Sequence, residues 1–346
     1  MNNKITHLGI DIGGAHLKIV GLDKKGIIIF VEYLSCKIWK GTKRLEELFH
    51  NLNNIFPDGL IKCAITITAE LCDNFANRNV GARELIKLCQ ILKFEKYFYV
   101  NNFSIFKKKP NVNDFISMNW HAIGKFMEKK VNDAIVLDFG STTTDFICIK
   151  NNKIINKYFD DFSRINNCEL LYTGFTRTPA FGVSDHIKID NKVLTLIPEH
   201  FSEMSDIYRV LNKLSKERDI DVTSDNRGKS KRESLIRISR SFGLDYKENL
   251  KIKLEKICYK ISSIQLNKIK KILIKLRKKF FSKSPIIVIS GIGQDVVYEF
   301  LRTNKFKTIY LHEFLEKSKL NKKASFHAPA LSVALILRTL KKLDNL

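Results

Sequence analysis

Short apolar runs separated by polar turns open the chain, and the same pattern returns in its middle. Within residues 7–33, and again within residues 134–158, an apolar run ends in Asp-x-Gly, namely Asp11–Gly13 and Asp138–Gly140. A polar turn, a second apolar run, a charged turn and a third run follow in both places. Apolar runs of this length between turns predict strands. The chain therefore encodes one three-strand unit twice.

Stretches with apolar residues three or four positions apart follow these strands and predict helices. In the first half we expect strands at 5–12, 15–23, 26–34, 61–68 and 97–100 and helices at 42–55, 82–93 and 113–129. In the second half we expect strands within 133–159 and at 286–290, an irregular stretch at 160–200, and helices at 203–214, 230–242, 247–281, 294–303 and 328–340. Alternating strands and helices predict an α/β protein with mixed sheets.

The duplicated pattern also predicts the domain organisation. A chain of 346 residues is long enough for two domains that each bury a core. We expect a first lobe at 1–130, a second lobe at 131–325, and a terminal helix at 326–346 that packs back near the junction of the lobes. Since no low-complexity linker separates the lobes, the boundary near residue 130 is expected to be a hinge.

The net charge of +24 has two interpretations. Lysine greatly outnumbers arginine, and asparagine, isoleucine and phenylalanine are abundant, as A/T-rich codons would produce. This composition favours charge dispersed over the surface, while a contribution to attracting anionic substrates stays open. No nucleic-acid-binding motif accompanies the charge, so we expect no nucleic-acid partner.

Cysteine spacing and the length of the apolar runs indicate which cellular compartment and which partners to expect. The seven cysteines show no CxxC spacing, which favours a reducing, cytoplasmic compartment over disulfides or a metal site. The longest apolar runs are well short of the ~20 residues that a membrane helix needs, so no membrane partner is expected. Whether the protein forms a homo-oligomer stays open.

The first Asp–Gly turn has the composition of a phosphate site. Gly13 and Gly14 let backbone N–H groups approach a ligand without intervening side chains. Asp11 would lie at a water molecule of Mg²⁺, and Lys18 would neutralise further phosphate charge. An ordinary hairpin turn is the simpler alternative for this segment alone.

The second Asp–Gly turn is richer in donors. Two carboxylates, Asp138 and Asp145, flank it, and a row of hydroxyls follows its glycine. The residues we expect to bind phosphate here are Gly140, Ser141, Thr142 and Thr143. A third turn, with Gly291 and Gly293, joins a predicted strand to a helix whose N-terminus favours anions. Two matching turns therefore predict a phosphate ligand with Mg²⁺ as cofactor, held by Asp11 and Asp138.

In this order the three turns resemble the actin/Hsp70/sugar-kinase superfamily, which implies a duplicated, two-lobed actin-like ATPase (ribonuclease H-like) fold. The intervening motifs are similar to those of the hydantoinase/oxoprolinase-like proteins linked to tetrahydromethanopterin one-carbon metabolism. These motifs are Ile-Thr-Ala-Glu-Leu at 67–71, Asn-Trp at 119–120, the turn at 140–145, the segment at 172–179 and Ala-Pro-Ala at 328–330.

The resemblance implies a transferase of methanofuran biosynthesis. It would condense an aminomethyl-furan-methyl diphosphate with γ-glutamyltyramine to an aryl ether and release diphosphate. Both partners would then be small molecules. Two alternatives stay open: an ATP-dependent kinase or hydantoinase/oxoprolinase-like amidohydrolase that uses the same turns for nucleotide, and a nucleotide-dependent scaffold.

Roles in this reaction follow for several residues. Asp138 is expected to be catalytic, and the base that takes the phenol proton is one of Glu70, Asp73 and Asp145, of which Asp145 is favoured. Substrate contacts are expected from three further residues: Thr68, Trp120, which could also be packing, and Arg177, which would bind the glutamyl carboxylate or else form a surface ion pair.

Overall fold

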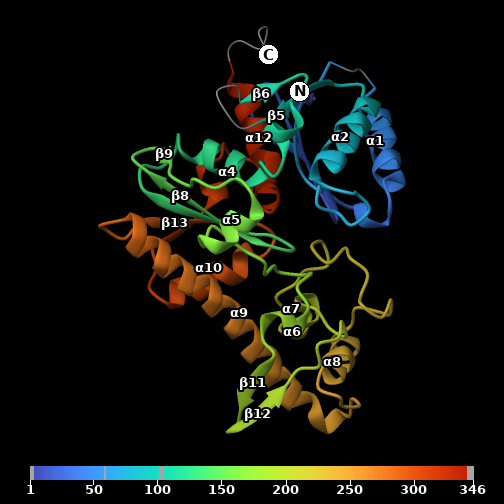
Figure 1. Ribbon diagram of the computed structural model, residues 1–346, viewed down its shortest axis with the longest axis vertical. Coiled ribbons are helices and arrows are strands. Elements are labelled where there is room, and N and C mark those ends of the chain that lie inside the picture. Colours follow the sequence, from blue (N-terminus) through green and yellow to red (C-terminus); the bar gives the residue numbers. More distant parts are fainter. Residues whose placement is uncertain (1–3, 58–59, 101–104, 341–346) are drawn as a thin grey trace. The chain divides into compact units, whose positions relative to one another are not determined.

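Two mixed sheets form the framework of the protein, one for each copy of the repeated strand pattern (Figure 1). The computed structural model describes residues 4–57, 60–100 and 105–340. The strand order is β3-β2-β1-β4-β5-β6 in the first sheet and β10-β8-β7-β13-β14 in the second, where β9 also pairs with β8. In both sheets the strand that ends in Asp-x-Gly lies between its hairpin partner and a strand from later in the chain.

The first sheet begins as an antiparallel meander and continues with parallel strands. Its strands are β1 (His7–Gly13), β2 (His16–Leu22), β3 (Ile28–Ser35), β4 (Lys62–Thr68), β5 (Glu95–Tyr99) and β6 (Phe106–Lys107). β4 runs parallel to β1, and β5 runs parallel to β4. Parallel neighbours need crossover connections. These contain α1 (Lys43–Ile55) and α2 (Arg78–Leu88).

The second sheet repeats the opening hairpin. Its strands are β7 (Ala134–Phe139), β8 (Thr144–Lys150), β9 (Lys153–Ile154), β10 (Leu170–Leu171), β13 (Ile286–Ser290) and β14 (Thr308–Tyr310). β7 and β13 are almost wholly buried, as expected of central strands covered on both faces. The third strand of this copy is only two residues long, which is shorter than the sequence predicts.

By its internal contacts the chain divides into two compact units. The first comprises Met1–Val136, Ile147–Ser163 and Tyr310–Leu346, and the second comprises Leu137–Phe146 and Arg164–Ile309. In the first unit, α12 (Ala328–Thr339) packs on β1, β2 and β4 and on α4 (Asn119–Met127). Because α12 is covered on several sides, it is apolar almost all round, in contrast to an amphipathic surface helix.

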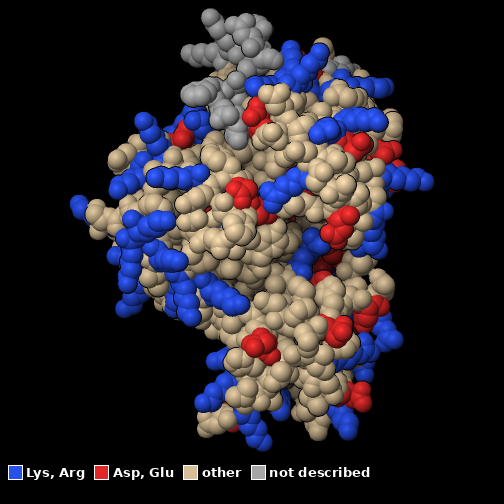
Figure 2. Space-filling model, in the orientation of Figure 1, with Lys and Arg blue, Asp and Glu red and all other residues tan. Residues whose placement is uncertain are grey.

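Helices of the second unit agree closely with the sequence pattern. They include α7 (Met204–Val210), α8 (Lys231–Arg240), α9 (Lys251–Phe280) and α10 (Gln294–Thr303). α9 is continuous over 30 residues, with one buried apolar face and a lysine-rich opposite face. Figure 2 shows Lys and Arg side chains dispersed over the drawn face of the molecule, with a denser group at its left.

Two helix predictions in the first unit need correction. The helix expected at 113–129 is two helices, α3 (Val112–Phe115) and α4, because the backbone at Ser117 adopts a left-handed conformation with φ 51°. The helix expected at 82–93 begins earlier, at Arg78, because the side chain of Asn77 accepts a hydrogen bond from the Val80 N–H and caps it.

The stretch expected to be irregular at 160–200 contains regular elements. These are α5 (Asp161–Asn166), β10, α6 (Ala180–Val183), β11 (His186–Ile189) and β12 (Lys192–Thr195). β11 and β12 pair as a hairpin whose two turn residues, Asp190 and Asn191, both have positive φ. A two-residue turn of this kind matches the twist of the strands, and Asp and Asn are among the residues that tolerate the positive φ it requires.

None of the helices within the described ranges combines the length and the apolar character that crossing a membrane requires.

A buried ion network joins the helices of the second unit. The Asp206 carboxylate on α7 accepts hydrogen bonds from Arg209 at 2.7 Å and from Arg237 on α8 at 2.8 Å. Arg209 also binds Asp219 with two nitrogens, at 2.6 and 2.8 Å. Because Arg237 is fully buried, its charge depends on Asp206, and on Asp225 at 3.0 Å, for compensation.

Asp206→Asn is therefore expected to lower the free energy of unfolding by about 3 kcal/mol, since the variant leaves buried guanidinium groups without their full counter-charge. Urea denaturation of the purified protein measures this loss. Asp245→Asn, at an exposed position, is the matched control and should change the free energy of unfolding by less than about 0.5 kcal/mol. Equal stability of the two variants would contradict the structural role of Asp206.

Candidate functional site

The first Asp–Gly turn joins β1 to β2 and brings four of the expected residues together. Asp11 is fully buried, and its Oδ2 accepts a hydrogen bond from Lys18 Nζ at 2.7 Å across the hairpin. Asp11 Oδ1 is buried without a hydrogen-bond partner among the described residues. Gly13 lies opposite Thr68 in the register of β1 and β4. This turn therefore combines an ion pair with an unused carboxylate oxygen.

Glu70 follows β4, which runs parallel to β1 and ends at the same end of the first sheet. Glu70 is almost fully buried. Its Oε1 accepts a hydrogen bond from the hydroxyl of Ser117, the residue whose left-handed backbone separates α3 from α4. Its Oε2 has no partner among the described residues. Burial raises the pKa of this carboxyl above its ordinary value, and the Ser117 hydrogen bond opposes that shift only in part.

The second Asp–Gly turn is closed by its own backbone. Gly140 N–H donates to the Thr143 carbonyl oxygen at 2.9 Å, and Asp138 Oδ1 accepts from Ser290 Oγ at 2.7 Å. The hydroxyls of Ser141 and Thr143 make no hydrogen bond with the described residues. Because these two hydroxyls are not used in hydrogen bonds within the turn, they are available to a ligand.

The 173–178 segment packs directly on this turn. Phe175 N–H donates to the Gly140 carbonyl oxygen at 2.8 Å, and Arg177 N–H donates to that of Ser141 at 3.0 Å. Arg177 Nη1 donates to Thr142 Oγ1 at 3.2 Å. At Gly174 a Cβ atom would lie 2.3 Å from the Ser141 carbonyl oxygen, so only glycine permits this approach. Arg177 is thereby placed on the turn expected to bind phosphate.

The third turn packs against the end of β7. Gly291 has φ 89°, and a Cβ atom there would lie 2.4 Å from the Phe139 carbonyl oxygen, so the position requires glycine. Gly293 N–H donates to that same oxygen at 3.0 Å, and α10 begins at the next residue. Within the second unit, the structure therefore brings the second and third turns together.

Two residues expected in the site are buried against other side chains of the protein. Asp145 is buried and forms an ion pair with Arg164 at 2.9 Å, and Arg164 also donates to the Glu169 carbonyl oxygen. Trp120 is 1% exposed within α4, where its ring lies 6.0 Å from that of Phe159. This burial favours packing for Trp120 over direct stacking on a substrate. The proposed contact of Thr68 with substrate stays a prediction.

Sequence reasoning missed three residues that shape these turns. Ser117 binds Glu70, Arg164 binds Asp145, and Arg218 donates to the Ile292 carbonyl oxygen of the third turn at 2.8 Å. Each contact joins residues more than ten positions apart, and none of the three residues belongs to a recognisable motif. The chain alone therefore gave no signal for them.

Among the described residues, no cluster of three or more His, Cys, Asp or Glu side chains forms a metal site.

Comparison with known proteins identifies the family. The model of the hydantoinase/oxoprolinase family matches residues 105–337. The chain belongs to the hydantoinase/oxoprolinase family. Within it, a protein of Methanocaldococcus jannaschii is 30% identical over 352 residues, covering 99% of this chain and 100% of that relative. It is named "(4-{4-[2-(gamma-L-glutamylamino)ethyl]phenoxymethyl}furan-2-yl)methanamine synthase".

A second relative, from Methanococcus vannielii, has the same name and is 30% identical over 219 residues, covering 62% of this chain and 95% of that relative. Both relatives are named as synthases, which indicates that this chain is an enzyme. The resemblance inferred from the motifs is thereby confirmed at the level of the family.

A solved structure supports the fold. The chain aligns with nucleotide-free acetone carboxylase, from a study of ATP-dependent acetone carboxylation, with a TM-score of 0.52 and 10% identity, over 95% of this chain and 70% of that one. At this identity the likeness concerns fold alone. Together with the repeated strand order, it confirms the predicted two-lobed, actin-like α/β fold with mixed sheets.

The raised pKa of Glu70 predicts a pH effect on stability. The unfolded chain ionises this carboxyl near its ordinary pKa of 4.5, whereas the folded protein holds the proton to higher pH. The unfolded state therefore binds fewer protons in this window, and stability falls as pH rises from the ordinary pKa to the folded pKa. Glu70→Gln removes the titration and should gain stability over wild type across that window.

Urea denaturation at a series of pH values between about 4 and 8 measures the difference. Glu84→Gln, at an exposed position on α2, is the matched control. The stability difference between Glu70→Gln and wild type should therefore change with pH. A difference that is constant with pH, or that shifts in favour of wild type as pH rises, would show that the pKa of Glu70 is not raised in the folded protein.

Proposed function

We propose that the protein is a transferase that joins an aminomethyl-furan-methyl diphosphate to γ-glutamyltyramine, with release of diphosphate. The observation that carries this proposal is the 30% identity to the named synthase of M. jannaschii over 99% of the chain. The name of that relative describes a phenol oxygen bonded to a methylene group on a furan ring. Formation of such an aryl ether is the bond-forming step that a synthase of this kind needs.

The proposed reaction is a displacement at the furylmethyl carbon. The phenol oxygen forms the new C–O bond, and the bond from the same carbon to the diphosphate oxygen breaks with its electron pair. The phenol proton passes to a base on the enzyme. The furan ring stabilises positive charge on the carbon, so the main requirement is stabilisation of the charge that develops on the leaving diphosphate.

The second Asp–Gly turn has the groups for that task. Ser141 and Thr143 have unused hydroxyls, and Arg177 supplies a guanidinium on the same turn through its contact with Thr142. Guanidinium groups bind phosphate oxygens in a charge-assisted, bidentate manner. We therefore assign Arg177 to the diphosphate. The sequence alone had favoured the glutamyl carboxylate as its partner.

Mg²⁺ is a proposed cofactor. It prefers oxygen ligands and takes one or two carboxylates together with substrate phosphates and water. In the second unit, Asp138 stands beside the donors of the second turn, which fits this chemistry. In the first unit, Asp11 fits it by its own surroundings, because one of its buried oxygens has no partner among the described residues. When bound, the ion would neutralise charge on the diphosphate.

Glu70 is a better candidate for the base than Asp145. Phenols titrate near pH 10, so a carboxylate with a raised pKa accepts their proton more readily than an ordinary one. Glu70 has both a raised pKa and an unused oxygen, whereas Asp145 compensates the buried charge of Arg164. We assign the base to Glu70 and a structural role in the second unit to Asp145.

An ATP-dependent reaction is the second candidate, because the same donor-rich turns could bind the phosphates of a nucleotide. One experiment separates the two candidates. Purified protein is incubated with the furan diphosphate, γ-glutamyltyramine and Mg²⁺ in the absence of nucleotide. We expect aryl ether and inorganic diphosphate in equal amounts. Turnover that requires ATP and yields ADP would contradict the transferase and support the alternative.

Asp138→Asn is expected to reduce kcat by about 100-fold or more, because the variant removes a carboxylate proposed to hold the Mg²⁺ that neutralises charge on the diphosphate. The amide oxygen of the new side chain can still accept from Ser290, so the melting temperature should change little. Diphosphate release and thermal unfolding measure the two effects, with Asp245→Asn as control. Loss of the fold together with activity would make Asp138 a structural residue.

Arg177→Ala is expected to raise the KM for the furan diphosphate about tenfold or more, because a charge-assisted contact is lost. The KM for the acceptor should stay near the wild-type value. Arg177→Lys keeps the charge and should fall between the two. An increase confined to the KM for γ-glutamyltyramine would instead place Arg177 at the glutamyl carboxylate.

A further inference from the structure

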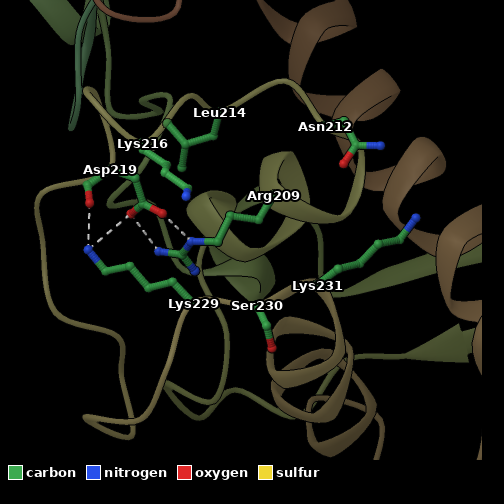
Figure 3. Close-up of a pocket in the computed structure, with 8 residues that line it drawn as sticks. All are labelled: Arg209, Asn212, Leu214, Lys216, Asp219, Lys229, Ser230 and Lys231. Carbon is green, nitrogen blue, oxygen red and sulfur yellow. Dashed lines mark hydrogen bonds and ion pairs between the residues drawn. The ribbon is translucent and has the colours of Figure 1, made fainter.

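A basic pocket of about 640 Å³ lies in the second unit, apart from the three turns (Figure 3). It is formed by the end of α7, the loop that follows, and the start of α8. Its lining residues are Arg209, Asn212, Leu214, Lys216, Asp219, Lys229, Ser230 and Lys231. In Figure 3 the side chains of Lys216, Lys229 and Arg209 gather on the side of Asp219, whereas Lys231 and Asn212 lie on the opposite side.

The charges of this lining do not balance. Asp219 is the only acidic residue among the lining side chains, and it binds Arg209 at 2.6 Å and Lys229 at 3.4 Å. Lys231 forms an ion pair with Glu255 at 2.8 Å. Lys216 forms no ion pair with any described residue. The pocket therefore presents more positive than negative charge, with one ammonium group available to a ligand.

The wall of the pocket is tied to the turns proposed to bind diphosphate. Arg218, adjacent to Asp219, donates to the Ile292 carbonyl oxygen of the third turn, and its guanidinium lies 5.4 Å from the centre of the Phe175 ring. At the start of α7, the helix whose end carries the lining residue Arg209, Ser205 N–H donates to the Thr176 carbonyl oxygen at 2.9 Å. One short segment thus borders both the pocket and the turns.

We propose that this pocket binds the free carboxylate of the glutamyl group of the acceptor, with Lys216 and Lys229 as its cationic partners. The inference rests on the proposed function, in which Arg177 is assigned to the diphosphate and the acceptor carboxylate needs another site. The glutamyl carboxylate lies at the opposite end of the acceptor from the reacting phenol. A pocket that is separate from the turns but shares a wall with them suits that separation.

Lys216→Ala tests the inference most cleanly, because the Lys216 side chain makes no hydrogen bond or ion pair with the described residues. Removing one charge-assisted contact should raise the KM for γ-glutamyltyramine about tenfold. The KM for plain tyramine, which lacks the carboxylate, and the KM for the furan diphosphate should not change. Lys216→Arg should restore the wild-type KM in large part. Lys268→Ala, at an exposed position on α9, is the matched control.

Lys216→Ala/Lys229→Ala should strengthen the effect on γ-glutamyltyramine without affecting tyramine. Unchanged KM for γ-glutamyltyramine in both variants, or an equal rise for both acceptors, would overturn the inference. Calorimetry separates this outcome from failure of the proposed function. If wild type shows no turnover but binds γ-glutamyltyramine about tenfold more tightly than Lys216→Ala does, the pocket is supported and the reaction is not. Equal binding by the two proteins would overturn the pocket as well.

Discussion

The backbone carbonyl groups of the second Asp–Gly turn accept hydrogen bonds from the 173–178 segment, and the geometry of the second unit depends on this contact. Carbonyl oxygens of Gly140 and Ser141 are bound from one side, which fixes the turn. The hydroxyls of Ser141 and Thr143 are left for other partners. Because Gly174 lies against the Ser141 carbonyl with no room for a side chain, the same contact brings Arg177 onto the turn. A donor-rich turn and a cation are thus held together by contacts within the protein itself.

Much of the fold was predictable from local patterns. The strand at 286–290 and the helix at 294–303 have the bounds expected from the sequence, because Gly291 and Gly293 separate the apolar strand from the periodic helix. The two Asp–Gly turns were recognisable for the same reason. The break at Ser117 was not, because its left-handed backbone belongs to a contact with Glu70 that is 47 residues away in the chain.

The roles of charged residues were harder to predict than the elements that carry them. The sequence alone favours Asp145 as the base. Its partner, Arg164, comes from α5, a helix within a stretch expected to be irregular. Burial and pairing, which decide whether a carboxylate can act as a base, depend on tertiary structure. The relatives support the proposed chemistry, and these contacts decide which residue fits each part of it.

The central claim is that the second Asp–Gly turn binds diphosphate through its unused hydroxyls. Calorimetric titration of the protein with Mg²⁺ and inorganic pyrophosphate tests this most directly, in wild type and in Ser141→Ala/Thr143→Ala. We expect saturable binding by wild type and affinity at least about tenfold weaker in the double variant, at an unchanged melting temperature. Equal affinity of the two proteins for pyrophosphate would contradict it.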